Sequence, residues 1–149
     1  MKKIVLFLIF LLSSCGYEPI FSSKNSNILI EEIIYDKNDR ISSKIKNGLN
    51  FLTSSKNYKE VIKLEIKSGK KIEISSKDTK GDPLVFKMTI SCDLEIFSND
   101  KLVRRKNISK DFSYNNISNK FNLKQYEKTI EENLIDIIKD DIILTLYNK

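Results

Sequence analysis

Apolar and polar residues alternate most cleanly between residues 84 and 96, where every second position is apolar. This period of two is typical of a strand with one buried and one solvent-exposed face. Residues 58–75 show the same alternation, and their apolar positions of one parity are Ile62, Leu64, Ile66, Ile72 and Ile74. The parity is unchanged across Ser68-Gly69, although a hairpin could form there. Unchanged parity favours one long strand, because a single-residue bulge would exchange the two faces.

The turn sequence at residues 81–83, Gly-Asp-Pro, separates these two stretches and predicts a hairpin. Folding the chain about residue 80 places Ile66 opposite Leu94 on the apolar face. On the polar face most opposed charges are complementary, but Glu65 then lies opposite Glu95, which is unfavourable. The pattern therefore predicts a register as well as two strands.

The other strands and the helices are predicted from the spacing of apolar residues and from the turn residues between them. Residues 28–35 are rich in β-branched side chains and predict the first strand. Residues 39–54 predict a helix with Asp39 as N-cap and with helically spaced Ile41, Ile45, Leu49 and Leu52. A turn at 98–101 precedes a fourth strand with weaker alternation at 102–114, and a long helix runs from Phe121 to the end. The order β-α-β-β-β-α predicts an α+β fold: a two-layer sandwich of a four-stranded, mostly antiparallel sheet with two helices on one face.

The first fifteen residues have the layout of an export signal. Two lysines precede nine consecutive apolar residues, Ile4 to Leu12, a run too short to span a bilayer, which needs roughly 20. The triplet Leu12-Ser13-Ser14 followed by Cys15 resembles a bacterial lipobox. An ordinary signal peptide with an incidental cysteine is the alternative. The lipobox interpretation divides the chain into a signal peptide (1–14), a lipidated tether (15–27) and a single α+β domain (28–149).

In lipoproteins of this type the cysteine becomes the first mature residue and carries a thioether-linked lipid. The resemblance thus implies a covalent lipid on Cys15 that anchors the chain to a membrane, and we expect no other cofactor. Gly16 occupies the position at which an aspartate usually marks inner-membrane retention, which implies the periplasmic face of the outer membrane. The apolar residues of 17–21 could pack on the domain, on a partner or on the bilayer interface.

Cys92 is the only other cysteine, so a lipidated Cys15 leaves it without a partner in the chain. It stands between Ile90 and Leu94 at strand spacing. Burial in the core is the first interpretation, and an intermolecular disulfide is the second.

Charge and composition exclude several classes of function. The formal net charge of +6 is mild for a nucleic-acid-binding protein, and an exported chain meets little nucleic acid. The sequence contains no histidine, the commonest general base and metal ligand. It also lacks a lipase-type serine elbow, a phosphate loop and clustered metal ligands. We therefore expect a protein that is not an enzyme, holds no metal and binds no nucleic acid.

One basic stretch stands out, with no acidic residue between Lys101 and Lys110. It contains Arg104, Arg105 and Lys106, and Arg104 and Lys106 share the parity of the apolar Leu102, Ile108 and Phe112. Such charges can protect an exposed edge strand from pairing with other chains. They can also form an anion site, because arginine and lysine pair well with phosphate.

Three short segments resemble the LPS-assembly lipoprotein LptE family, in particular its alphaproteobacterial members. They are Cys15-Gly16-Tyr17-Glu18-Pro19-Ile20-Phe21, Phe112-Ser113-Tyr114-Asn115, and Asn119-Lys120-Phe121 at the start of the last helix. The order of elements is also similar, whereas the lysine-rich second strand and the scarcity of Gly and Pro depart from the family.

The resemblance implies a lipoprotein that assists assembly of an outer-membrane β-barrel LPS-assembly protein, plugs its lumen and contributes to the transport and surface insertion of lipopolysaccharide. Lys101, Arg104, Arg105 and Lys106 are then candidate contacts to lipopolysaccharide phosphates. The alternative is a lipoprotein subunit of a periplasmic lipid-transport system or an envelope scaffold.

Overall fold

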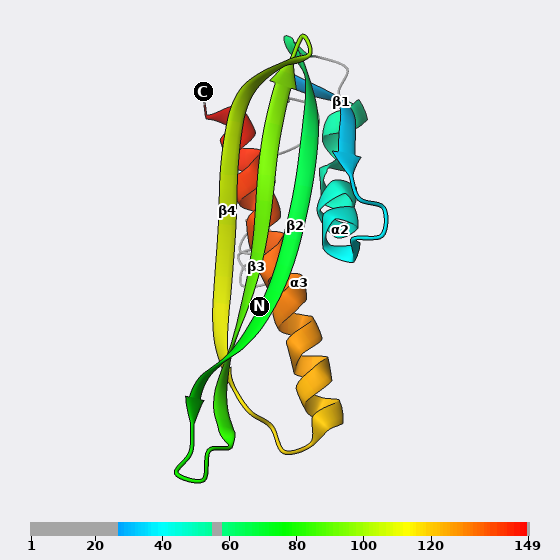
Figure 1. Cartoon of the computed structure of the whole chain (residues 1–149). Helices are drawn as coiled ribbons and strands as arrows, with labels where there is room; N and C mark the ends of the chain where they lie inside the picture. Colours follow the sequence, from blue (N-terminus) through cyan, green and yellow to red (C-terminus); the bar gives the residue numbers. More distant parts are fainter. Residues whose placement is uncertain (1–26, 55–57, 149) are drawn as a thin grey trace, which may run out of the picture.

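The computed structural model describes residues 27–54 and 58–148, which form a four-stranded sheet covered on one face by two helices (Figure 1). The elements are β1 (Ile28–Tyr35), α2 (Arg40–Leu49), the 3-10 helix η2 (Asn50–Ser54), β2 (Glu60–Lys77), β3 (Pro83–Ser98), β4 (Lys101–Asn115) and α3 (Lys120–Tyr147). This confirms the α+β two-layer fold and its element order. The predicted helix at 39–54 is α-helical only to Leu49 and continues as the tighter 3-10 turn. The division into signal peptide and tether lies outside the described residues.

The strands lie side by side in the order β1-β2-β3-β4. β1 and β2 are parallel because α2 carries the chain back to the same end of the sheet between them. The two later pairs are antiparallel hairpins. The sheet therefore has two edges, the short β1 and the long β4.

The predicted register of the central hairpin is confirmed. Ile66 pairs with Leu94, and Glu65 pairs with Glu95. β2 passes through Ser68-Gly69 without a turn or bulge, and its irregularity lies beyond Ile74. The two opposed glutamates are tolerated because each has a cation of its own: Lys67 Nζ lies 2.8 Å from Glu65, and Arg105 Nη2 lies 2.7 Å from Glu95.

Both hairpin turns are built by local chemistry. In the β2–β3 turn, Asp78 Oδ1 accepts hydrogen bonds from the backbone N–H groups of Lys80 and Asp82, each at 2.8 Å. Gly81 has φ +90°, which side-chain-bearing residues rarely adopt. Asn99 and Asp100 have φ of 50° and 57°, as the two-residue type I′ hairpin turn between β3 and β4 requires.

Gly48 explains how closely the two helices approach each other. A side-chain Cβ at this position would come within 2.3 Å of Lys139 Cδ on α3. The absence of a side chain therefore lets the Lys139 methylene stem lie against α2.

The apolar row of β2 is covered over only part of its length, which the alternation alone did not predict. Ile66 is fully buried, whereas Ile72 and Ile74 are 40 % and 46 % exposed. The reason is the position of α2, whose N-cap Asp39 accepts a hydrogen bond from the Ser68 hydroxyl. The helix begins there, so β2 runs on past α2, although Met88, the partner of Ile72 on β3, stays fully buried. Only the tip of the β2–β3 hairpin extends beyond both helices (Figure 1).

Cys92 is completely buried among the strand residues that face the helices. Burial raises the pKa of its thiol to about 12, with smaller contributions from Asp93 and Asp39. The position confirms core packing and leaves no route to an intermolecular disulfide in the folded chain.

We expect Cys92 to resist maleimide in the native protein and to react after unfolding, because the reactive species is the thiolate. Mass spectrometry after labelling at pH 7.5, with and without 6 M guanidinium, measures this difference. Labelling at equal rates in both conditions would contradict the buried assignment.

Candidate functional site

The predicted basic site lies at the end of the sheet where the described chain enters. This entry end consists of Asn27, the starts of β1 and β2, the Asn99–Asp100 turn and the last turn of α3. The C-terminal end of α3 reaches it across the sheet face (Figure 1). The backbone N–H of Lys59 donates to the carbonyl of Asn27 at 2.8 Å, which fixes the point of entry beside β2.

Arg104 projects from β4 toward the helices and caps the end of α3. Its Nη1 donates to the carbonyl oxygens of Thr145, at 3.0 Å, and Asn148, at 2.8 Å. The last carbonyls of a helix lack intrahelical partners and carry partial negative charge. The Arg104 guanidinium donates hydrogen bonds to these carbonyls and offsets their negative charge. Arg104 therefore joins β4 to α3.

Lys106 lies beside Arg104 on the same face. Its Nζ donates to Thr145 Oγ1 at 2.8 Å, and the Thr145 hydroxyl donates to the Asp141 carbonyl at 2.6 Å. Both cations therefore face the negative end of the helix. The parity that predicted their direction toward the apolar side is confirmed.

The structure does not bring all four candidate residues together. Arg105 points to the opposite face of the sheet, where its Nε donates to Glu95 at 2.7 Å. Lys101 is exposed at the start of β4, next to the hairpin turn. Arg104 and Lys106 thus form the only pair among the four that shares a partner, Thr145, in the part of the chain that the structure describes.

A hollow of about 360 Å³ lies at this pair. It is lined by Arg104, Arg105, Lys106, Asp141, Leu144, Thr145 and Asn148. The guanidinium of Arg105 is nevertheless paired with Glu95 on the other face. Asp141 is paired with Lys110 at 2.8 Å. The hollow can hold an anion by charge-assisted hydrogen bonds if the basic side chains exchange a helix carbonyl or hydroxyl for the ligand.

A bulge at Val103 shapes an apolar groove that shares Arg104 and Thr145 with this hollow. Arg104 pairs with Ile96 and Leu102 pairs with Phe97, so Val103 is the extra residue. Leu102 consequently lies on the face of Phe97, opposite to the direction that unbroken parity gave it. Val103 instead lines a groove with Ile28, Ile62, Ile96 and Leu146. Sequence reasoning missed this bulge because no glycine marks it.

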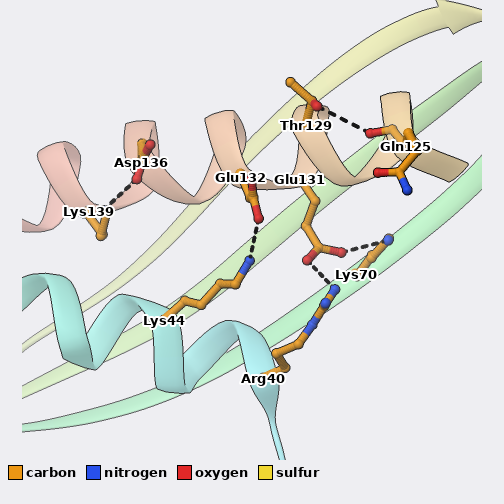
Figure 2. Close-up of polar contacts among 9 residues, drawn as sticks. All are labelled: Arg40, Lys44, Lys70, Gln125, Thr129, Glu131, Glu132, Asp136 and Lys139. Carbon is orange, nitrogen blue, oxygen red and sulfur yellow. Dashed lines mark hydrogen bonds and ion pairs between the residues drawn. The ribbon is translucent and has the colours of Figure 1, made fainter.

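A second feature that the sequence did not reveal is an ionic cluster around a buried carboxylate, between the helices and β2 (Figure 2). Glu131 of α3 is 1 % exposed. Its Oε1 accepts from Arg40 Nη2 of α2 at 2.5 Å, and its Oε2 accepts from Lys70 Nζ of β2 at 2.8 Å. One carboxylate therefore fixes three elements relative to one another.

The contacts of Glu131 with Arg40 and Lys70 are called the Glu131 clamp below. Asp39 adds further contacts between the start of α2 and β2. It accepts hydrogen bonds from the Ile41 backbone N–H at 2.9 Å, from the Ser42 hydroxyl at 2.6 Å, and from Ser68 of β2. Burial acts to raise the pKa of this carboxyl, but the hydrogen bonds outweigh burial and lower it. The cluster stabilises the packing of α2 on the sheet.

The described residues contain no group of three or more potential metal ligands. Among the described helices, none is both long and apolar enough to cross a membrane.

Comparison with known proteins identifies the fold. No protein-family model matches the chain, and no curated sequence matches it. Rare lipoprotein B from Shewanella oneidensis has a TM-score of 0.58 at 11 % identity, covering 78 % of this chain and 93 % of that one. A putative lipoprotein from Caulobacter crescentus and a minor lipoprotein from Acinetobacter baumannii each have a TM-score of 0.56 at 14 % identity, covering 78 % of this chain and 86 % and 87 % of theirs. The resemblance noted in the sequence is thus confirmed at the level of the fold, which is LptE-like.

Proposed function

From the fold shared with these lipoproteins, we propose that this chain is an outer-membrane lipoprotein, anchored by a lipid on Cys15, that assists assembly of a β-barrel LPS translocon and plugs it. It would thereby contribute to lipopolysaccharide transport to the cell surface. The observation that carries the proposal is a fold match that extends over 93 % of rare lipoprotein B. The proposed role includes no catalytic step and no cofactor other than the covalent lipid.

Two surface features support it. The β2–β3 hairpin carries exposed apolar side chains, among them Ile72, Ile74 and Leu84, that could contact the wall of a barrel. The hollow at Arg104 and Lys106 offers two cations to phosphate groups. The proposal places lipopolysaccharide contact there.

Co-purification tests the proposal. We expect the tagged wild-type lipoprotein, isolated from detergent-solubilised outer membranes, to bring with it a large β-barrel protein identified by mass spectrometry. The Cys15→Ala variant should lose fatty-acid labelling and accumulate as an uncleaved or soluble precursor. An inner-membrane complex in place of the barrel would contradict the proposal and favour a subunit of a periplasmic lipid-transport system or an envelope scaffold.

The lipopolysaccharide contact has its own test. Arg104→Ala combined with Lys106→Ala should weaken binding of purified lipopolysaccharide at least tenfold, because each charge-assisted hydrogen bond contributes about 1.5–3 kcal/mol. Surface plasmon resonance on the intact lipoprotein measures the affinity, and co-purification checks that the barrel complex still forms.

Two double variants serve as controls for that measurement. Lys67→Ala with Lys71→Ala removes the same charge from cations that pair with glutamates elsewhere on β2, and it should leave affinity unchanged. Arg104→Lys with Lys106→Arg keeps both charges and should retain most binding. If the first control loses affinity as strongly, binding follows net charge and the site assignment is wrong.

A further inference from the structure

An apolar groove opens at the entry end, beside the point where the described chain begins. Its volume is about 280 Å³, and its apolar lining residues are Ile28, Ile62, Ile96, Val103 and Leu146. A second hollow of about 460 Å³ shares Ile28 and Leu146 with it and reaches Asn27 and Lys59. The two hollows adjoin at Ile28 and Leu146, and together they extend from Val103 on β4 to Asn27, where the described chain begins.

Val103 shows that the groove has an uncovered rim. This side chain lines the groove and is 57 % exposed, although a bulge directs it to the apolar side. Arg104 lines the groove and Lys59 lines the adjoining hollow, while the acidic Glu60 lines both, so the charges of the lining are mixed. Because most of the lining is apolar, a fitting occupant is a short apolar segment.

Residues 17–21 of the same chain, Tyr-Glu-Pro-Ile-Phe, have this chemistry. Six polar residues, 22–27, separate them from Ile28, and seven residues span at most about 25 Å, which is enough to turn back along the groove. We propose that residues 17–21 pack into the entry-end groove as a strap, with the apolar side chains inside and Glu18 directed to Arg104 or Lys59. A segment covalently attached beside the groove has a high effective concentration there.

The strap sets the position of the domain relative to the membrane. With residues 17–21 docked, only Gly16 remains between Cys15 and the strap. The entry end is then held at the membrane surface, whereas a free tether of residues 15–27 would let the domain move about 40 Å away. The membrane position rests on the lipid on Cys15 proposed above, whereas the docking of residues 17–21 depends on neither a barrel partner nor lipopolysaccharide.

Cysteine trapping in the intact lipoprotein tests the strap. Tyr17, Ile20 and Phe21 are each replaced by cysteine and combined either with Val103→Cys or with Leu102→Cys. Leu102 is the matched control, because it is adjacent in sequence and 47 % exposed but lies on the other face of the sheet. Cys92 is fully buried and stays in place.

After mild oxidation in vesicles of phosphatidylethanolamine and phosphatidylglycerol, we expect at least one strap position to cross-link to position 103 at least ten times faster than to position 102. Mass spectrometry of peptides quantifies both products, and thermal unfolding verifies that each variant is folded. Equal rates at the two positions for all three pairs would overturn the proposal, because a tether that moves freely does not distinguish the faces. A second outcome would also overturn the proposal. If cross-linking to both positions stays at the background rate and the Phe21→Cys thiol is protected from a water-soluble maleimide, the segment lies in the bilayer.

Discussion

Replacing both Arg40 and Lys70 by methionine is expected to lower the free energy of unfolding by about 3–5 kcal/mol, because it leaves the Glu131 carboxylate buried without a cation. Glu131 is 1 % exposed, whereas the side chains of Arg40 and Lys70 are 62 % and 32 % exposed. The cations can therefore turn to water when the pair is broken, and the carboxylate cannot. Urea denaturation at pH 7, followed by circular dichroism, measures the loss.

The reverse substitution should behave differently. Glu131→Met fills a similar volume with an apolar side chain of similar helix propensity, so we expect stability within about 1 kcal/mol of the wild type or above it. Lys44→Met breaks the neighbouring exposed pair with Glu132, at 3.2 Å, and should lower stability by at most about 1 kcal/mol. Equal losses for Glu131→Met and the Arg40/Lys70 double variant would show that the ion pairs themselves, and not the desolvated carboxylate, determine the effect.

Leu94→Ala is expected to lower the free energy of unfolding by about 2–5 kcal/mol, the range for large-to-small substitutions in a core. Leu94 is completely buried on β3, opposite Ile66 on β2. Its removal leaves a cavity that the paired strands on both sides prevent from collapsing. The midpoint of urea denaturation should fall with little change in slope.

Leu84→Ala supplies the matched control on the same strand. Leu84 is on the same parity of β3 as Leu94 but is 49 % exposed, because it lies on the hairpin beyond the helices. We expect it to lower stability by less than about 1 kcal/mol. A loss equal to that of Leu94→Ala would mean that the hairpin is covered in the native protein.

The arrangement of these features bears on the proposed role. The Glu131 clamp and the Arg104 cap hold both helices rigidly on the sheet, from which the hairpin projects at the end opposite to the entry of the chain (Figure 1). A strap at the entry end would present that hairpin away from the membrane surface. In this geometry the exposed apolar hairpin is the part of the domain best placed to reach a partner.

The candidate site was predictable only in part. That Arg104 and Lys106 point to the helix side follows from strand parity, which is a local property of the chain. Their partners, the carbonyls at the end of α3, lie about forty residues further along and could not be inferred from β4 itself. Glu131 resembles any surface carboxylate in the sequence, and its burial depends on cations contributed by two other elements.

The sequence by itself determined the elements and the pairing of the long hairpins, because alternation, the turns at Gly81 and Asn99–Asp100, and the cap Asp39 act within a few residues. The tertiary structure alone decided which apolar residues are covered. Ile66 and Ile72 have the same local pattern, but one lies under the helices and the other lies past the start of α2. Burial depends on where elements distant in sequence end relative to the sheet, and this information is not contained in any single segment.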